Sequence, residues 1–464
     1  MILHYLSLFL HLIAVKAHRG VQRDRKIEIY MDQVGVELCH QENVSLRAGF
    51  VDKGQQQTRC LTPDLHVDKC SVYERILQDL EPFQGGIRKE AILDSFGLPA
   101  YRYKKIFVRI CQGKIEIFRQ KGENLPHNVI RRARAVKQLI VDLMNRVYLP
   151  DVELVLSFGD APSMPKQPDA LPLAFMRDKS SITAAPRLPI FSVCKTSDFY
   201  DILFPFTMIH HGFISKGICP KLKTRPWRIR ESKLNTRFTT TDFATYRWLH
   251  ANESAALSHR AVYAKLSDSK DIDIRFVRLP KSLAQEMGIL PREYGQRFAL
   301  PFFSKFNFKY LLSIDGNGYQ SSFKNIARGG SLIFKVNTFP NGAQATFEHW
   351  YAGVLEGQDL IGIHNSSEIG EWILWAQTHD REAKKMAYRL GAKVEKYLSK
   401  DHIQCYLFRL LQSYSFLLQY DVGEEESKRH KGMEKLEFRD LRSTSRQSYL
   451  NEPDSFIEWC MNQR

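Results

Sequence analysis

Hydrophobic residues recur at helical spacing between Arg131 and Tyr148. Apolar side chains three and four residues apart share one face, and basic side chains hold the other, which predicts an amphipathic helix. The apolar run Val152–Leu156 follows and predicts a buried strand. The polar, Gly- and Pro-containing stretch from Ser157 to Pro162 then predicts a loop. This part of the chain therefore predicts helix, strand and loop in succession.

Strand and helix patterns alternate more regularly from Ile272 to Tyr420. Strands are expected in this stretch at 272–277, 310–314, 331–336 and 360–363, and a further strand is expected before it, at 188–193. Helices are expected at 321–328, 347–354, 366–377, 379–397 and 402–419. Such alternation predicts an α/β fold class with a parallel sheet and helices on both faces. Parallel sheets bind ligands outside the carboxyl ends of their strands.

Composition narrows the class of protein. The 464 residues suggest two or three domains, and 44% hydrophobic with 25% charged residues is ordinary for a globular protein. A largely disordered chain, a collagen and a multi-span membrane protein are excluded. Lys and Arg number 67 against 51 Asp and Glu, a net charge of +16 that favours an anionic partner. No aromatic-interleaved basic motif accompanies the charge, so nucleic acid is not the expected partner.

The N-terminal apolar run, Ile2 to Val15, is shorter than the roughly 20 residues of a membrane-spanning helix. It is typical of a signal peptide, with small residues at Val15 and Ala17 for cleavage after Ala17. A short signal anchor or a buried N-terminal strand is the alternative. We expect a signal peptide at 1–17, no stable membrane span, and the lumen of the endoplasmic reticulum or Golgi. The last four residues, Met461–Arg464, match no retention signal, so secretion stays open.

The eight cysteines are widely scattered and include no C-x-x-C pair, which argues against a zinc site. In an oxidising lumen some of them should pair.

A candidate anion site lies between Lys309 and Lys324, where a strand runs into a glycine-containing turn and a serine-led helix. Ser321 and Ser322 can cap that helix, and its free N–H groups can receive an anion. Lys324 in the first turn can neutralise a phosphate. The alternative is an ordinary strand–helix turn with a serine cap and a solvated lysine.

Two other polar features each have two interpretations. Asp160, directly after the strand at 152–156, can serve as a general base or can cap its turn. The basic run from Lys221 to Arg230 is either a solvated face or, with Trp227 and Arg247, the lining of an anionic pocket.

Several segments, in this order and spacing, resemble glycosyltransferase family 90, which includes the Rumi-type protein O-glucosyltransferases and fungal capsule-associated xylosyltransferases. The resemblance spans roughly residues 68 to 420. The segments are 81–87 for the family's "PF-GGI", 188–198 with 201–205 for "PVFSF-K-T…DI-YP", 309–324 for "KY-…DG…S-RF" and 330–334 for "GSLVF".

The resemblance implies a GT-B architecture, in which two Rossmann-like domains enclose the active site in a cleft. It implies an inverting transfer of a sugar, glucose or xylose, from a UDP-sugar to a hydroxyl of a secretory protein or glycan. No cofactor is expected beyond the UDP-sugar co-substrate, and no metal. The expected parts are an acceptor domain at 18–215, a donor domain at 216–397, a helix returning to the first domain at 398–420, and a charged tail at 421–464.

The resemblance also assigns roles to individual residues. Asp160 matches the family's catalytic base, and Cys70 and Cys405 match a disulfide pair. The residues matched to donor binding are Thr241, Arg247, Ser321, Ser322, Phe323 and Lys324.

This sequence departs from the family pattern at three places. Phe238–Thr241 stands where the family has Phe-Arg-Gly-Ser, and Ile209–Gly212 replaces "FWEG". Lys324 replaces an arginine, which keeps the charge but loses the bidentate fork. A divergent acceptor or a weak donor site would explain these changes. The alternative function is a catalytically inactive family member that acts as a binding protein.

Overall fold

The computed structural model describes most of the chain after Arg59, and all of these residues belong to one compact unit, Asp52–Gln463. The described residues are 59–62, 64–66, 69–98, 104–166, 187–206, 225–239, 258–267, 270–290, 294–295, 298–316, 318–339, 344–423, 432–438 and 453–463. The expected signal peptide and the expected boundary at 215/216 lie outside them.

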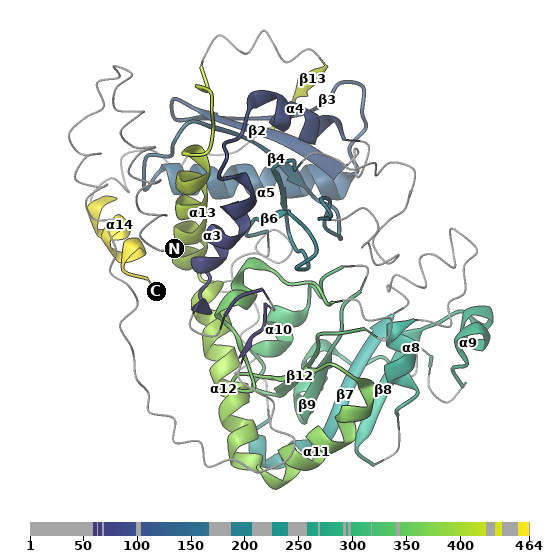
Figure 1. Ribbon diagram of the computed structural model, residues 1–464. Coiled ribbons are helices and arrows are strands. Elements are labelled where there is room, and N and C mark those ends of the chain that lie inside the picture. Colours follow the sequence, from purple (N-terminus) through teal and green to yellow (C-terminus); the bar gives the residue numbers. More distant parts are fainter. Residues whose placement is uncertain are drawn as a thin grey trace. The chain divides into compact units, whose positions relative to one another are not determined.

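The chain folds as a mixed α/β protein (Figure 1). The α-helices are α3 Glu74–Leu80, α4 Lys89–Gly97, α5 His127–Met144, α8 His259–Ala264, α9 Lys281–Met287, α10 Phe323–Ala327, α11 Ile369–Thr378, α12 Asp380–Tyr397, α13 Lys400–Ser415 and α14 Pro453–Met461. The strands are β1 Arg59–Cys60, β2 Lys105–Cys111, β3 Lys114–Gln120, β4 Val152–Ser157, β5 Ile190–Ser192, β6 Ile202–Leu203, β7 Glu231–Thr239, β8 Ile272–Arg278, β9 Phe308–Ser313, β10 Leu332–Val336, β11 Leu355–Glu356, β12 Ile361–Ile363 and β13 Met433–Lys435. Short 3-10 helices lie at Glu81–Phe83, Trp227–Ile229, Phe302–Asn307, His349–Gly353 and Ser366–Glu368.

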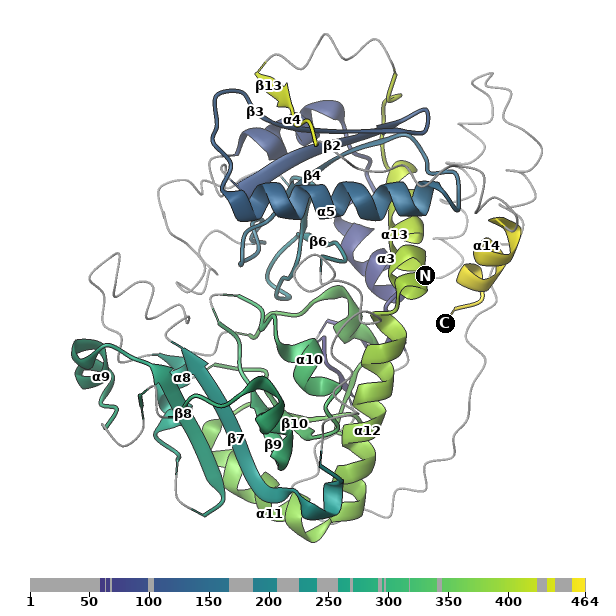
Figure 2. The same ribbon diagram turned by 180° about the vertical axis from the view of Figure 1, so that it is seen from behind.

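A six-stranded sheet has the order β13-β3-β2-β4-β5-β6. The strands β4, β5 and β6 are parallel, whereas β2 pairs antiparallel with both β3 and β4. The β2–β3 hairpin, which the sequence analysis does not predict, turns at Gln112 and Gly113, both with positive φ as a type I′ turn requires. The strand predicted at 152–156 is β4, and all six of its residues are buried. The amphipathic helix predicted between Arg131 and Tyr148 is α5, which begins at His127 and packs against β3 (Figure 2).

A second, five-stranded sheet has the order β12-β10-β9-β7-β8, and every pair in it is parallel. Read from the other edge, the order is β8-β7-β9-β10-β12. When these five strands are numbered along the chain, they lie in the order 2-1-3-4-5, which is the flavodoxin-like doubly wound order. In such sheets the order reverses between the first and third strands, and ligands bind beyond the carboxyl ends at that point. The predicted parallel sheet is confirmed, and its ligand crevice is expected where β7 and β9 end.

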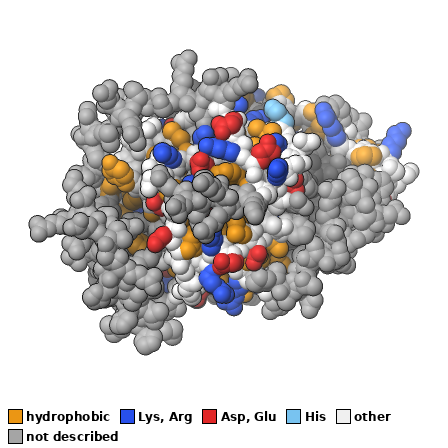
Figure 3. Space-filling model, turned by 90° about the horizontal axis from the view of Figure 1, so that it is seen from above, with side chains coloured by type: hydrophobic (Ala, Val, Ile, Leu, Met, Phe, Trp, Pro, Cys, Tyr) orange, Lys and Arg blue, Asp and Glu red, His pale blue; other side chains and the backbone are white. Residues whose placement is uncertain are grey.

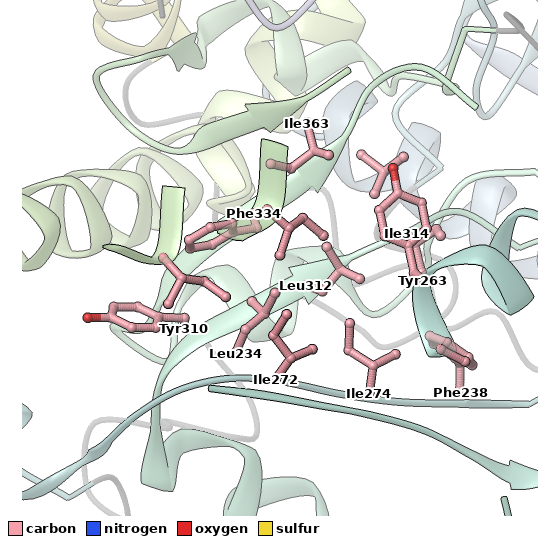
Figure 4. Packing of buried hydrophobic residues seen from close by; sticks show 14 of the residues in the cluster. Leu234, Phe238, Tyr263, Ile272, Ile274, Tyr310, Leu312, Ile314, Phe334 and Ile363 are labelled. Carbon is pink, nitrogen blue, oxygen red and sulfur yellow. The ribbon is translucent and has the colours of Figure 1, made fainter. Parts of the chain in front are cut away.

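The core of this sheet is built from large apolar side chains on adjacent strands. Figure 4 shows Leu234, Ile274, Leu312 and Phe334 in one packed layer, and each is at most 1% exposed. Burying a side chain of this size stabilises a fold by roughly 1.5 to 3 kcal/mol. The layer fixes the strand ends that carry the polar residues described below.

Two short strands pair with segments about 300 residues away in the sequence, and the first pair is a separate two-stranded sheet. The early strand β1 pairs with β11, beside the five-stranded sheet, and the late strand β13 pairs with β3 in the six-stranded sheet. Part of the segment expected as a charged tail is therefore a strand. Two ion pairs accompany this backbone pairing: Lys435 lies 2.9 Å from Glu116, and Glu434 lies 3.0 Å from Arg119. On the face seen in Figure 3, acidic and basic side chains are interspersed.

The disulfides correct another expectation. Cys60 bonds to Cys70, and Cys405 bonds to Cys460, so the expected Cys70–Cys405 pair is wrong. Cys405 is buried on a face of α13 that α14 covers, where His402 of α13 also stacks on Trp459 with 5.0 Å between ring centroids. Cys70 instead closes a short loop to a residue ten positions earlier. No helix within the described ranges combines the length and the apolar character needed to cross a bilayer.

Candidate functional site

Asp160 lies in the bend that follows β4, and its side chain is 51% exposed. The nearest cation is Arg132 of α5, whose guanidinium lies 3.8 Å from the Asp160 carboxylate. Arg132 also donates a hydrogen bond to the carbonyl oxygen of Phe158 at 2.6 Å. The carboxylate is thus accessible to a hydroxyl while the main chain before it is anchored. Its position at a strand end is the one that the sequence analysis predicts.

The main chain after Asp160 is held by Asp201, which is fully buried. The two carboxylate oxygens of Asp201 accept hydrogen bonds from the backbone N–H groups of Ser163 and Met164, each at 2.7 Å. Ser192 of β5 donates a third bond at 2.5 Å. Burial raises the pKa of Asp201, and these hydrogen bonds oppose the increase.

A second loop follows β9 in the parallel sheet, and buried Asp315 organises it. One carboxylate oxygen of Asp315 accepts from Lys335 at 2.9 Å, and the other accepts from the N–H and the hydroxyl of Thr346, both at 2.8 Å. The main-chain oxygen of Asp315 accepts from Arg260 at 3.1 Å, and Arg260 also donates to the carbonyl of Thr239 at 2.8 Å. Arg260, which no motif signals, therefore ties the end of β7 to the end of β9.

The loops after β4 and β9 meet at the main chain. A side-chain carbon added to Gly318 would overlap the carbonyl oxygen of Asp160. The same oxygen accepts from the thiol of Cys194 at 3.5 Å. Burial raises the pKa of the Cys194 thiol well above its usual value. The carboxyl ends of strands from both sheets therefore converge beside Asp160, which only the tertiary structure reveals.

The predicted serine cap is wrong. Ser322 is the N-cap residue of α10, but its side chain makes no capping hydrogen bond. Its φ of −85° and ψ of −7° are helical, whereas a capping side chain needs an extended backbone to reach the first-turn N–H groups. The carbonyl of Ser322 instead accepts from the N–H of Asn325 at 3.0 Å. Ser321 is exposed at the start of this turn.

The next two donor candidates are buried. Phe323 stacks on Trp350 with 5.3 Å between centroids and meets Tyr351 edge-on at 5.1 Å, so its side chain belongs to the core. Lys324 is 4% exposed, and burial lowers its pKa to about 8, while the charge of Glu348 opposes the decrease. Lys324 is therefore not the solvated lysine of the alternative interpretation. Thr241 and Arg247 lie outside the described residues.

The described part of the basic run contains both exposed and buried side chains: Arg225 and Arg228 are exposed, as on a solvated face. Trp227 is buried and donates to the carboxylate of Asp380 at 3.0 Å. Arg230 is buried and donates to the carbonyls of Gly329 and Gly330 at 3.2 and 2.7 Å. Arg230 therefore holds the turn before β10, and Trp227 contacts the first residue of α12, so both side chains have structural partners.

His349 sits beside Lys324 and gives a pH-dependence that can be measured. It is 1% exposed, and neither ring nitrogen has a hydrogen-bond partner among the described residues. Burial first, and the charge of Lys324 second, lower its pKa from 6.5 to about 3. Between these two pH values the unfolded chain therefore binds more protons than the folded chain. The contribution of neutral His349 to the free energy of unfolding is complete above pH 6.5 and decreases as the pH falls toward 3.

We expect the wild type to lose about 2 kcal/mol of unfolding free energy through His349 between pH 7.5 and pH 5. His349→Phe keeps a ring against Tyr406 but cannot take up a proton, so it should lose about 2 kcal/mol less over that interval. Urea unfolding of both proteins at the two pH values measures the difference. Equal losses in the two proteins would contradict the assignment.

Within the described ranges, no group of three or more His, Cys, Asp or Glu side chains is arranged to hold a metal ion.

Comparisons with known proteins agree on one family. The model of glycosyl transferase family 90 matches residues 65–453. Protein O-glucosyltransferase 1 of Homo sapiens is 23% identical over 432 residues, which cover 90% of this chain and 93% of that protein. Protein O-glucosyltransferase 3 of Homo sapiens is 24% identical over 291 residues, or 60% of this chain. Protein O-glucosyltransferase 2 of Danio rerio is 24% identical over 286 residues, also 60% of this chain.

In the last two comparisons the matched region spans about half of the relative, 49% and 50% of its length. The match to the family model, in contrast, covers most of this chain and includes β4, β9 and the loops that meet at Asp160. The chain therefore belongs to glycosyl transferase family 90.

Proposed function

We propose that the chain is an inverting glycosyltransferase that transfers a sugar from a UDP-sugar to a hydroxyl group of a protein or glycan. The observation that carries the proposal is the half-exposed carboxylate of Asp160, at the point where the loops after β4 and β9 meet. The relatives are named protein O-glucosyltransferases, which favours glucose as the sugar and protein as the acceptor, with xylose as the other candidate.

In the proposed reaction Asp160 accepts the proton of the acceptor hydroxyl as its oxygen attacks the anomeric carbon. The bond from that carbon to the diphosphate breaks on the opposite face, and UDP leaves with the electron pair. Arg247, Lys324, and the turn at Ser321 and Ser322 with Thr241 are the proposed donor contacts. Cationic side chains can stabilise the leaving diphosphate as a metal ion would, so no divalent metal is required in this scheme.

We further propose that the two sheets are the two Rossmann-like domains of a GT-B enzyme, with the acceptor on the six-stranded side and the donor on the five-stranded side. The doubly wound order of the five-stranded sheet supports a nucleotide site at the ends of β7 and β9. The two disulfides support an oxidising compartment such as the lumen of the endoplasmic reticulum or Golgi.

One observation favours the second candidate function, a binding protein without catalysis. Lys324 is only 4% exposed, so a diphosphate can contact it only if the residues that cover its side chain move. Together with Phe238–Thr241 in place of Phe-Arg-Gly-Ser, this suits a family member that kept the fold and lost donor binding.

Binding and turnover of UDP-sugars separate the two functions. We expect UDP and UDP-glucose to raise the melting temperature of the chain, with or without EDTA, because a ligand that binds only the folded state stabilises it. Arg247→Ala should weaken UDP binding by about 1.5 to 3 kcal/mol in calorimetry, the range for a charge-assisted contact. Binding abolished by EDTA contradicts the donor site. Neither transfer nor donor hydrolysis with any UDP-sugar favours the binding protein.

A further inference from the structure

We infer that Asp201 is a positioning residue for the catalytic base, acting on Asp160 through the main chain; this rests on the proposed function. Asp201 belongs to the segment 201–205, which the sequence analysis uses only to identify the family.

The contacts of Asp201 converge on the loop that carries Asp160. Its two carboxylate oxygens accept from the N–H groups of Ser163 and Met164, the third and fourth residues after Asp160. Ser192 of β5, the strand parallel to β4, donates to the same carboxylate. A single buried side chain therefore joins the end of one strand to the loop that follows its neighbour.

The main chain before Asp160 is fixed independently. The N–H of Phe158 donates to the carbonyl of Lys104 at 2.9 Å, and the carbonyl of Phe158 accepts from Arg132. The loop is thus pinned two residues before Asp160 and three residues after it. Between the pins the carbonyl of Asp160 contacts Gly318 and Cys194, and the carboxylate is the part that faces outward.

A carboxylate is a costly way to hold a loop. Burying an ionised group destabilises a fold unless hydrogen bonds and charges compensate it. Here three hydrogen bonds compensate the charge, and Lys195, which donates to the main-chain oxygen of Asp201 at 2.9 Å, adds a nearby cation. Two of the three bonds end in the Asp160 loop. Hydrogen bonds placed in this way are expected of a side chain that fixes the position of a base, because small displacements of reacting groups cost about 10²-fold in rate.

Asp201→Asn keeps the shape of the side chain but replaces one accepting oxygen with an N–H₂ group that cannot accept from a backbone N–H. We expect kcat to fall by about 10- to 100-fold with KM for UDP-glucose changed by less than about three-fold. Backbone N–H exchange with deuterium should become faster at Ser163 and Met164. In the background of Asp160→Asn, Asp201→Asn should cause no further loss of kcat, because its effect passes through Asp160.

Two other variants separate positioning from a general loss of stability. Asp359 is also fully buried and accepts from a backbone N–H, that of Leu355, and from Lys393, each at 2.7 Å. Asp359→Asn should lower the melting temperature without lowering kcat. Ser192→Ala removes one donor and keeps the carboxylate, so it should lower kcat by about 3- to 10-fold and serves if Asp201→Asn does not fold.

The inference is overturned if Asp201→Asn leaves kcat or the exchange at Ser163 and Met164 unchanged, or if its effect adds fully to that of Asp160→Asn. For an Asp201→Asn protein that does not fold, unchanged kcat in Ser192→Ala overturns it. Each of these outcomes leaves the proposed function standing, because the wild type still transfers sugar. A wild type without transfer overturns the proposed function first and this inference with it.

Discussion

Replacing Asp160 with asparagine should lower the rate of sugar transfer by about 10² to 10⁴ and leave UDP affinity within a few-fold of wild type. An acceptor hydroxyl is a poor nucleophile at neutral pH, so an inverting transfer needs a base on the face opposite the leaving UDP. Asparagine has the same size and cannot accept the proton. The side chain is half exposed and its neighbour Arg132 has a second partner in Phe158, so folding should survive.

The measurement is transfer from UDP-glucose together with calorimetry of UDP binding. Asp151 is a matched control: it lies just before β4, at the end opposite Asp160, and its carboxylate accepts from the N–H of Gln112 at 2.7 Å. Asp151→Asn should transfer sugar at the wild-type rate. A wild-type rate in Asp160→Asn itself would show that another group accepts the proton.

Gly318→Ala should destabilise the chain by at least about 2 kcal/mol and impair transfer as well. The added methyl group would overlap the carbonyl oxygen of Asp160, so either main chain must move. Neither can move cheaply, because Asp201 and Phe158 pin one loop and Asp315 holds the other. Overpacking against backbone costs more than overpacking against a flexible side chain, which can rotate away.

Thermal or urea unfolding measures this loss, and activity at a temperature where the variant is folded measures the second effect. Gly370 in α11 is the control, since an added side-chain carbon there meets nothing within 4 Å. Gly370→Ala should be neutral or stabilise by up to about 1 kcal/mol, because alanine is the better helix former. Equal stability of the two variants would mean that the loops separate freely.

The elements that the sequence predicts are those whose burial follows a simple pattern. The parallel strands read as continuous apolar runs because both faces are covered, and β4 and β10 are found within one residue of their expected ends. The strand β2 is also buried throughout, but it begins with one cation, and a second cation interrupts its apolar run. Lys105 donates to the carbonyls of Ser95 and Leu98 at 2.9 and 2.5 Å, and Arg109 pairs with Glu116 at 3.0 Å. Only tertiary partners make such a strand possible, so local pattern does not reveal it.

The candidate site likewise combines features that the sequence predicts with features that only the tertiary structure shows. The strand-end position of Asp160 could be predicted because it follows a buried run, whereas its role as a base rests on the resemblance to the family. Its contact with Gly318 joins two loops that follow strands of different sheets, and its support from Asp201 depends on the pairing of β4 with β5. The disulfide expectation failed because a pair carried over from relatives does not include α14, whose Cys460 bonds to Cys405 in this chain. Local periodicity reports what is buried, and it does not report which segments pack against each other.

The pairing of β1 with β11 and of β13 with β3 has a consequence for biosynthesis. The ribosome releases the six-stranded sheet's hairpin early, yet the edge of that sheet is covered by β13, which pairs Lys435 with Phe118 more than 300 residues later. The strand β1 precedes the other described strands in the chain and stays unpaired until β11 has been translated, because Arg59 pairs with Glu356. The edge of the six-stranded sheet therefore cannot be completed until β13 has been translated. A chain whose synthesis stops before β13 should keep an open strand edge, which is the kind of surface that chaperones bind and aggregates recruit.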